Sequence, residues 1–143
     1  MVMRETNARD IPIVSYFQPV GEGAILITPT ESRLTANGQM FALMKEHQDA
    51  RLCKVTDDDD YSTVASIKDD ILTVTLINAG FSEDRAFDFK LKGTLLGGTL
   101  YSSDDVTAHT YFTESPLSVV YKNKILHTVL PAHSVAIFRM KIR

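Results

Sequence analysis

The sequence predicts a mainly β fold, an antiparallel β-sandwich of the jelly-roll kind that is preceded by one helix. Three observations carry this prediction. Residues 71–78 have the pattern of an interior strand, residues 34–47 carry a clear helical pattern, and from residue 51 onward short strand patterns alternate with polar turn signals. Frequent turns between short strands are typical of antiparallel sandwiches.

Residues 71–78 are expected to form a strand inside the sheet. One side of this strand is wholly apolar and the other is mostly β-branched (Leu72, Val74 and Leu76; Ile71, Thr73, Thr75 and Ile77). Such a pattern favours an interior strand. Asp69 and Asp70 precede it and suit the tight corner of a hairpin, so residues 61–67 are expected to be its antiparallel partner.

The first third of the chain has a different pattern. Residues 13–17 and 24–27 are short apolar runs. Such runs are more typical of a covered parallel sheet than of a surface hairpin, yet the rest of the chain offers them no parallel neighbours. A helix is predicted over residues 34–47, with Thr35 or Asn37 as its cap. Its apolar face is expected to pack in the core (Met40, Phe41, Leu43, Met44 and His47).

The sequence from residue 51 onward predicts eight strands and no second helix. The strands are expected at residues 52–55, 61–67, 71–78, 85–91, 98–102, 119–121, 125–130 and 135–142. The strand at 85–91 alternates cleanly, which points Phe87, Phe89 and Leu91 inward.

The composition excludes several classes of function. A chain of 143 residues with a net charge of −3 has no basic face for general nucleic-acid binding. It contains no apolar run long enough for a membrane span. The first residues lack the apolar core of a signal peptide, which indicates a cytoplasmic protein if the chain start is native. The single cysteine, Cys53, excludes an internal disulfide framework and is expected to pack as a small hydrophobe.

The sequence provides no catalytic or metal-ligating motif and implies no cofactor. The run of aspartates at residues 57–60 lacks the alternation and glycine of a calcium loop, so it is expected to be a solvated turn, as is Asp104-Asp105. The four histidines lack ligand spacing and are expected to be hydrogen-bonded structural residues (His47, His109, His127 and His133). A nucleophile elbow and a phosphate-binding loop are also missing.

Several segments in order resemble the end of the catalytic barrel and the β-sandwich of α-L-arabinofuranosidases of glycoside hydrolase family 51. The matching segments are residues 14–18, 26–30, 38–50, 75–78, 100–109 and 130–135. The resemblance implies two parts. Residues 1–50 would be the end of a (β/α)8 barrel, with a short strand remnant and the last helix at about 34–48, and residues 51–143 would be a C-terminal β-sandwich.

The resemblance also implies a role in a larger enzyme. Family members remove terminal arabinofuranosyl groups from arabinan or arabinoxylan with retention, using two glutamates that lie on earlier barrel strands. Those glutamates have no counterpart in this chain, so it is expected to be a structural domain without activity of its own. Gln18 matches the glutamine that contacts the sugar at the mouth of the last barrel strand. The chain departs from the family pattern at Ser15 and over residues 19–22.

Two alternatives come from other classes of function. A carbohydrate-binding module would need exposed aromatic platforms, and the candidates are expected rather to fill the core or its edge (Tyr101, Tyr111, Phe112 and Tyr121). A self-associating interaction domain would form homo-oligomers through the apolar N-terminal region, where residues 13–17 and the helix lack a barrel to cover them.

Overall fold

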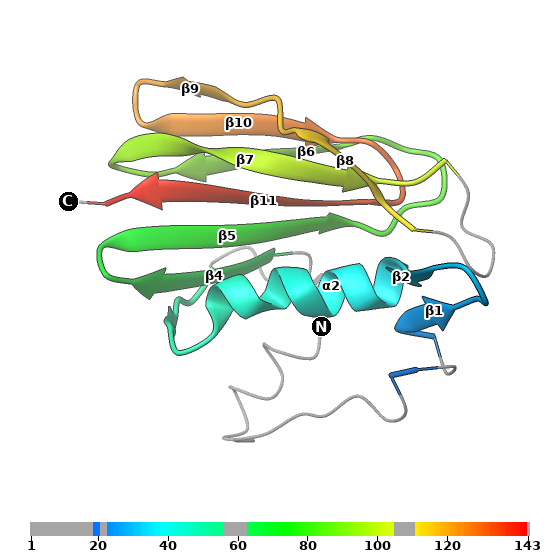
Figure 1. The fold of residues 1–143 in the computed structure, drawn as a ribbon. Helices are drawn as coiled ribbons and strands as arrows, with labels where there is room; N and C mark the ends of the chain where they lie inside the picture. The colour runs from blue at the N-terminus through cyan, green and yellow to red at the C-terminus, as the bar shows by residue number, and fades with distance from the viewer. Residues whose placement is uncertain (1–18, 21–22, 56–62, 105–110, 143) are drawn as a thin grey trace.

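The computed structural model describes residues 19–20, 23–55, 63–104 and 111–142. In these ranges the chain forms one helix, a short 3₁₀ turn and eleven strands (Figure 1). The first strands form a separate hairpin, and the others form two sheets. The N-terminal elements are β1 (Ile25–Ile27), β2 (Ser32–Leu34), α2 (Ala36–Met44), the 3₁₀ turn η1 (Lys45–His47) and β3 (Arg51–Leu52).

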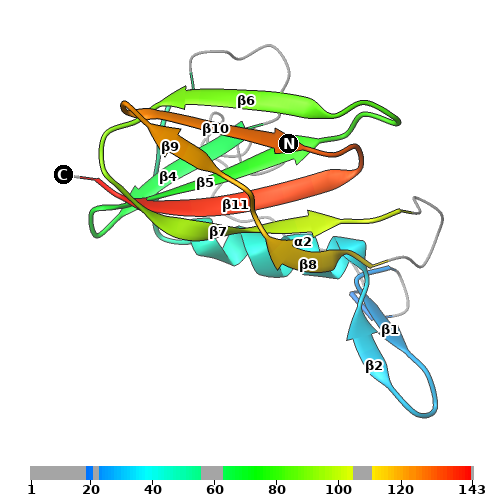
Figure 2. The same ribbon diagram turned by 90° about the horizontal axis from the view of Figure 1, so that it is seen from above.

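The strands after β3 build the sandwich that the sequence predicts. They are β4 (Thr63–Lys68), β5 (Ile71–Asn78), β6 (Arg85–Lys90), β7 (Thr94–Ser102), β8 (Thr113–Pro116), β9 (Val120–Lys122), β10 (Ile125–Leu130) and β11 (Ser134–Lys141). Six strands form one sheet in the order β3-β4-β5-β11-β7-β8, and three form the other in the order β6-β10-β9. Every pairing between named strands is antiparallel, and the smaller sheet lies over one face of the larger one (Figure 2).

The core lies between the two sheets. Both β5 and β11 send alternate apolar side chains into it, and β10 meets them from the smaller sheet. The fully buried large apolar side chains are Leu76, Leu126, Leu130, Phe138 and Met140. Phe87 and Phe89 of β6 also face this core, with their rings stacked at 6.4 Å, which confirms the predicted inward side of that strand.

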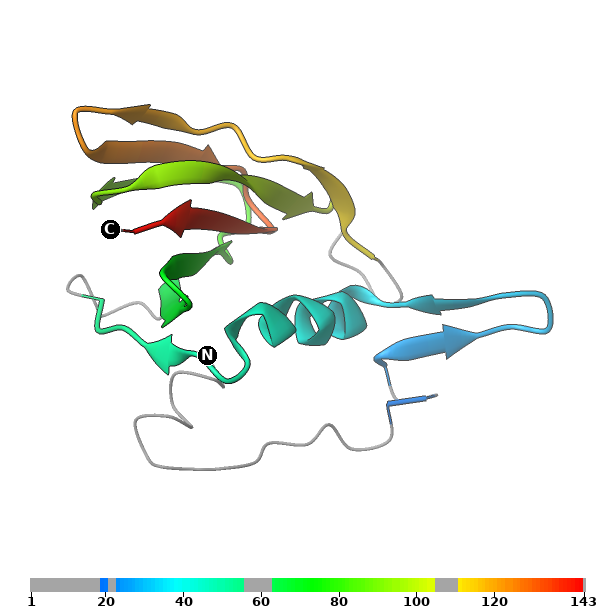
Figure 3. The ribbon, with the colours of Figure 1, turned by 60° about the vertical axis from the view of Figure 1, so that its left-hand side comes forward.

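The opposite face of the six-stranded sheet is covered in part by α2 (Figure 3). Leu43 of the helix packs against Val135 and Ile137 of β11, and Met40 and Met44 flank this contact. The helix is also bound to the segment that precedes β8, because the Gln39 side chain and the Phe112 backbone form two hydrogen bonds of 2.6 and 2.9 Å. The central strands are therefore buried on both faces, as the sequence predicts for β5.

Two hairpins show why the turns form where they do. Asp69 and Asp70 between β4 and β5 both have positive φ, as do Asn123 and Lys124 between β9 and β10. Two consecutive left-handed residues make a type I′ turn, whose twist matches that of the flanking strands. The predicted corner at Asp69-Asp70 is confirmed. The second corner carries a lysine in a backbone conformation that is unfavourable for residues with a Cβ.

A buried asparagine joins the end of β5 to the connection between the sheets. The Asn78 side-chain amide donates hydrogen bonds to the carbonyl oxygens of Glu83 and Leu130 at 2.8 and 3.0 Å. Its Oδ1 accepts from the Gly80 N–H at 3.0 Å. These bonds satisfy backbone groups that would otherwise be stranded where the chain leaves one sheet for the other.

The predicted helix and its apolar face require correction. Leu34 belongs to β2, and α2 begins at Ala36 because Thr35 caps it, with its side chain accepting from the Gly38 N–H. Phe41 was expected in the core but is 49% exposed. The short helix rests on one flat sheet, so only the stripe that holds Leu43 and Met40 meets that surface.

Some strand predictions also need correction. The predicted limits of β5 and β10 are confirmed. Strand β7 begins at Thr94, four residues earlier than expected, and β3 ends at Leu52. Strand β8 was not predicted, because its exposed Thr-Glu-Ser-Pro sequence has low strand propensity. The strand forms at the edge of the sheet, where it pairs only with β7. The apolar run at 24–27 pairs with β2 in an antiparallel hairpin. Residues 13–17, 57–60, 105 and 109 lie outside the described ranges.

Candidate functional site

The outer face of the six-stranded sheet carries side chains in rows that cross three strands. The registers of β5, β11 and β7 place outward-facing residues side by side. From one end of the sheet to the other, these rows are Ile77-Val135-Tyr101, Thr75-Ile137-Thr99 and Thr73-Arg139-Gly97. Helix α2 covers the first row, η1 reaches the second, and the third lies beyond the helix. The helix therefore leaves the third and most polar row of the outer face uncovered.

His47 fixes the end of the helix over the sheet. Its Nδ1 lies 2.7 Å from the Ser66 hydroxyl, and its Nε2 lies 2.9 Å from the Thr75 hydroxyl. All three side chains are buried. One ring nitrogen of a neutral imidazole donates and the other accepts, and hydroxyls accommodate either role. The expectation that His47 is a hydrogen-bonded structural residue is confirmed.

Burial lowers the pKa of His47 below its usual value of 6.5, and the neighbouring Glu46 carboxylate opposes this shift to a smaller extent. The imidazole is therefore neutral at neutral pH. A neutral ring suits its surroundings, because Ser66 and Thr75 provide hydroxyls and no counter-charge.

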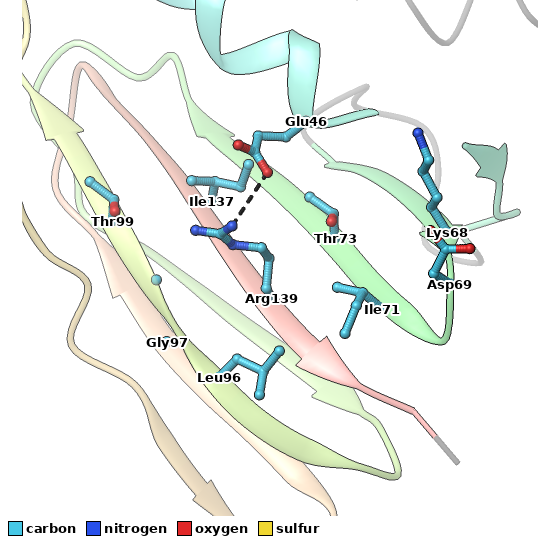
Figure 4. Close-up of a pocket in the computed structure, with 11 residues that line it drawn as sticks. Glu46, Lys68, Asp69, Ile71, Thr73, Leu96, Gly97, Thr99, Ile137 and Arg139 are labelled. Carbon is cyan, nitrogen blue, oxygen red and sulfur yellow. Dashed lines mark ion pairs between the residues drawn. The ribbon is translucent and has the colours of Figure 1, made fainter. Parts of the chain in front are cut away.

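A groove of about 590 Å³ begins where the helix ends (Figure 4). Its walls come from η1, the β4–β5 turn and strands β5, β7 and β11. The residues that line it are Glu46, Lys68, Asp69, Ile71, Thr73, Leu96, Gly97, Gly98, Thr99, Ile137 and Arg139. At its centre Arg139 Nη1 lies 3.5 Å from Glu46 Oε2, and both side chains remain about half exposed. The ion pair is thus accessible from solvent.

A second hollow of about 210 Å³ adjoins this groove and shares four lining residues with it, Glu46, Thr99, Ile137 and Arg139. It adds Tyr101 and Glu114, together with part of α2. The pKa of Tyr101 is raised first by burial, then by the carboxylates of Glu114 and Glu46, against the opposing effect of Arg139. Tyr101 and these three charged side chains line the same hollow. We call the two joined hollows the outer groove.

At Gly97 part of the outer groove is lined by backbone without a side chain. Its φ is +130°, which favours glycine, and a Cβ added there would meet no atom within 4 Å. The strand pairing is irregular at this point, because Arg139 pairs with Gly97 and Met140 with Leu95, which leaves Leu96 as an extra residue in β7. A bulge re-aims the side chains beside it. The result is an open stretch of backbone next to Arg139.

The other candidates from the sequence fall in separate places. Gln18 and His109 lie outside the described residues. His127 forms a pair with Asp88 at 2.9 Å on the exposed face of the smaller sheet, while His133 packs its ring edge-on against Phe81. Cys53 is partly buried against the core, close to its expected place. None of these described residues converges with another to form a site.

The four aromatic candidates behave largely as core or edge residues. Tyr101 and Phe112 pack beside the helix contact, and Tyr121 packs on the main core while its hydroxyl donates to the Leu91 carbonyl at 3.2 Å. Tyr111 is half exposed, with the Arg33 guanidinium 4.7 Å above its ring. A stacked sugar would compete with that guanidinium for the ring face.

Sequence reasoning missed the outer groove. Glu46, Arg139 and Thr99 are far apart in the chain. The register of β11 and β7 places Arg139 and Thr99 near each other, and the hydrogen bonds of His47 bring η1, with Glu46, onto the same face. The available signal was an arginine inside an apolar stretch of β11, since Arg139 lies between buried Phe138 and Met140.

The outer groove has the chemistry of a binding surface. It offers carboxylate and hydroxyl acceptors and a guanidinium donor, and among the described residues that line it no nucleophile is in contact with a base. Within the described ranges no three His, Cys, Asp or Glu side chains are placed to hold a metal ion. In the same ranges no helix has the length and apolar character needed to cross a membrane.

No family model and no curated protein sequence matches this chain. Solved structures do match. The catalytic domain of the GH30 xylanase C from Talaromyces cellulolyticus aligns with 82% of this chain at a TM-score of 0.62 and 16% identity. The GH51 arabinofuranosidase from Xanthomonas axonopodis pv. citri aligns with 82% at a TM-score of 0.59 and 19% identity. A family 51 α-L-arabinofuranosidase from Bifidobacterium longum aligns with 81% at a TM-score of 0.57 and 16% identity.

These likenesses show the fold. They bear out a β-sandwich with an associated helix, of the kind found in part of these glycoside hydrolase chains. The present chain spans about a quarter of the length of each, at 27%, 28% and 27%. The likeness extends to GH30 enzymes as well as to GH51 enzymes, so it is broader than the resemblance in sequence implies.

The depressed pKa of His47 predicts how stability depends on pH. Between the folded pKa and 6.5 the unfolded chain binds more protons than the folded chain, so stability is complete above about pH 6.5 and falls as the pH decreases below it. Chemical denaturation at pH 7.5 and pH 5.0 measures this loss. His47→Gln, which keeps a hydrogen-bonding side chain but does not titrate, should show a smaller loss. An equal loss in both proteins would contradict the prediction.

Proposed function

We propose that this chain is the C-terminal accessory domain of a glycoside hydrolase, with a structural role and no activity of its own. The observation that carries the proposal is the match in fold. Four-fifths of this chain aligns with a portion that makes up about a quarter of GH30 and GH51 enzyme chains. A domain with this place in larger enzymes would serve to support the catalytic part.

The contact between helix and sheet suggests how this support would operate. In the proposed division, residues 1–50 are the end of a (β/α)8 barrel and residues 51–143 are the sandwich. Helix α2 would then be the last barrel helix. Leu43 and His47 attach it to the outer face of the sheet. A helix that belongs to the barrel while it packs on the sandwich would hold the two parts in a fixed orientation.

We further propose that the complete enzyme acts on arabinose-containing polysaccharides such as arabinan or arabinoxylan. The ordered sequence resemblance to family 51 supports this narrower assignment, and two of the matching structures are arabinofuranosidases. In the complete enzyme Gln18 would contact the sugar at the mouth of the last barrel strand. The two catalytic glutamates would come from earlier barrel strands that this chain lacks.

The proposal predicts that the purified 143-residue chain does not hydrolyse arabinofuranosides or xylan. Retaining hydrolysis needs two carboxyl groups about 5 Å apart on either side of the scissile bond, which the proposal assigns to the missing barrel strands. Release of nitrophenol from an aryl α-L-arabinofuranoside, and of reducing sugar from xylan, measure this directly. Hydrolysis that purifies with the folded chain, and that is absent from a parallel preparation of an unrelated protein, would contradict the proposal.

A second candidate function is self-association through the N-terminal region. The β1–β2 hairpin projects from the sandwich (Figures 2 and 3), and one of its faces carries Ile27 and Leu34, which are 58% and 41% exposed. Exposed apolar side chains on a projecting hairpin favour association with another chain. In the absence of a barrel, this face would pair with a second copy.

Self-association predicts that the chain is a dimer and that Ile27→Glu makes it a monomer. The charge would be buried without a partner in the dimer but solvated in the monomer. Light scattering over a concentration series measures the mass. Val120→Glu is the matched control, because Val120 is equally exposed but lies on the smaller sheet, far from the hairpin in sequence. A monomeric parent chain, or a dimer that survives Ile27→Glu, would contradict this candidate.

A further inference from the structure

The outer groove is a continuous surface built by several elements of the chain. Its two hollows share Glu46, Thr99, Ile137 and Arg139, so a ligand that lies along the sheet can contact both. It runs from the β4–β5 turn, past the end of η1, to Tyr101 and Glu114 near β8. Strands and a helix end that are held by buried contacts supply its walls, and a rigid scaffold lowers the entropic cost of binding.

The charges along the outer groove favour a neutral ligand. Lys68 and Arg139 are its cations, and Glu46, Asp69 and Glu114 are its carboxylates. An anionic ligand placed against Arg139 would also face Glu46, whose carboxylate lies 3.5 Å from the guanidinium. A cationic ligand would in turn face Arg139. The near-balance of the two signs leaves hydrogen bonding as the main polar interaction.

The polar groups suit a ligand that carries many hydroxyl groups. A guanidinium presents parallel N–H donors and a carboxylate presents two acceptor oxygens, so each can bind a pair of adjacent hydroxyls. Thr99 and Tyr101 add hydroxyl groups that can donate or accept. The half-exposed ion pair of Arg139 and Glu46 offers the two kinds of group next to each other.

The apolar part of the outer groove suits the flat face of a sugar ring. Leu96 is 55% exposed at the groove, and Gly97 beside it presents bare backbone. This surface could contact C–H groups while the polar groups bind hydroxyls at the ring edge. Among the described residues of the larger hollow there is no aromatic side chain, so binding should be weak.

We propose that the outer groove binds a short neutral pentose oligosaccharide, such as one derived from xylan or arabinan. The sugar class rests on the proposed function, whereas the neutral, polyhydroxylated character rests on the groove itself. Such a subsite would hold a polysaccharide chain on the accessory domain, beside the helix that the proposed function assigns to the barrel.

An NMR titration of the full chain with xylotetraose and with arabinotetraose tests the proposal. Backbone amide signals of Gly97, Gly98 and Thr99 should shift, with a Kd of the order of 1 mM. Arg139→Gln and Glu114→Gln should each weaken binding by about tenfold, because each removes a charged hydrogen-bonding group. Lys122→Gln, on the smaller sheet, is the matched control and should leave the Kd unchanged.

Several outcomes would overturn the proposal. They are no shift at about 50 mM sugar, shifts confined to the smaller sheet, and unchanged binding in both groove variants. Tighter binding of an oligogalacturonate than of the neutral sugars would also overturn it, because the ligand would then be anionic. Since Glu46, Arg139 and Glu114 are exposed or half exposed, the variants should keep the parent amide spectrum away from the groove. Failure here leaves the structural role intact, which the hydrolysis assay tests independently.

Discussion

The pairing of β5 with β11 is the constraint on which the rest of the structure depends. The two strands pair over their full lengths, from Ile71–Lys141 to Asn78–Ser134, and both faces of the pair are largely withdrawn from water. One face needs the smaller sheet as its cover, and the other needs α2. Because side chains alternate along a strand, a shift of one residue in this pairing would exchange the two faces and remove both covers.

On the outer face, one polar contact determines where the apolar packing of the helix on the sheet ends. Thr75 lies at the centre of the sheet and is fully buried, so its hydroxyl needs a partner. His47 supplies that partner and also bonds to Ser66, which brings η1 down onto the sheet. The preceding residue, Glu46, is thereby placed beside Arg139. A buried hydrogen bond that stabilises the fold thus also positions the exposed ion pair of the outer groove.

The sequence predicted those parts of the fold that local patterns determine. Short strand patterns between turn signals defined β5 and β10, and the paired aspartates defined the turn at Asp69-Asp70, because these features depend on neighbouring residues. The exposure of Phe41 and the edge strand β8 depend on what the rest of the chain places beside them, so the local pattern was wrong or silent there. The outer groove could not be predicted for the same reason, since Glu46 and Arg139 meet only because the long-range contacts of His47 hold η1 on the sheet.

The central claim is that this domain belongs to a longer glycoside hydrolase, and the size of the native protein tests it most directly. An antibody raised against the 143-residue chain would identify the native product in an immunoblot of the source cells. The account predicts a band about three times larger than the 15.9 kDa of this chain, because comparable enzyme chains are about three times its length. A single band at 15.9 kDa would contradict the account and would favour an independent binding or self-associating domain.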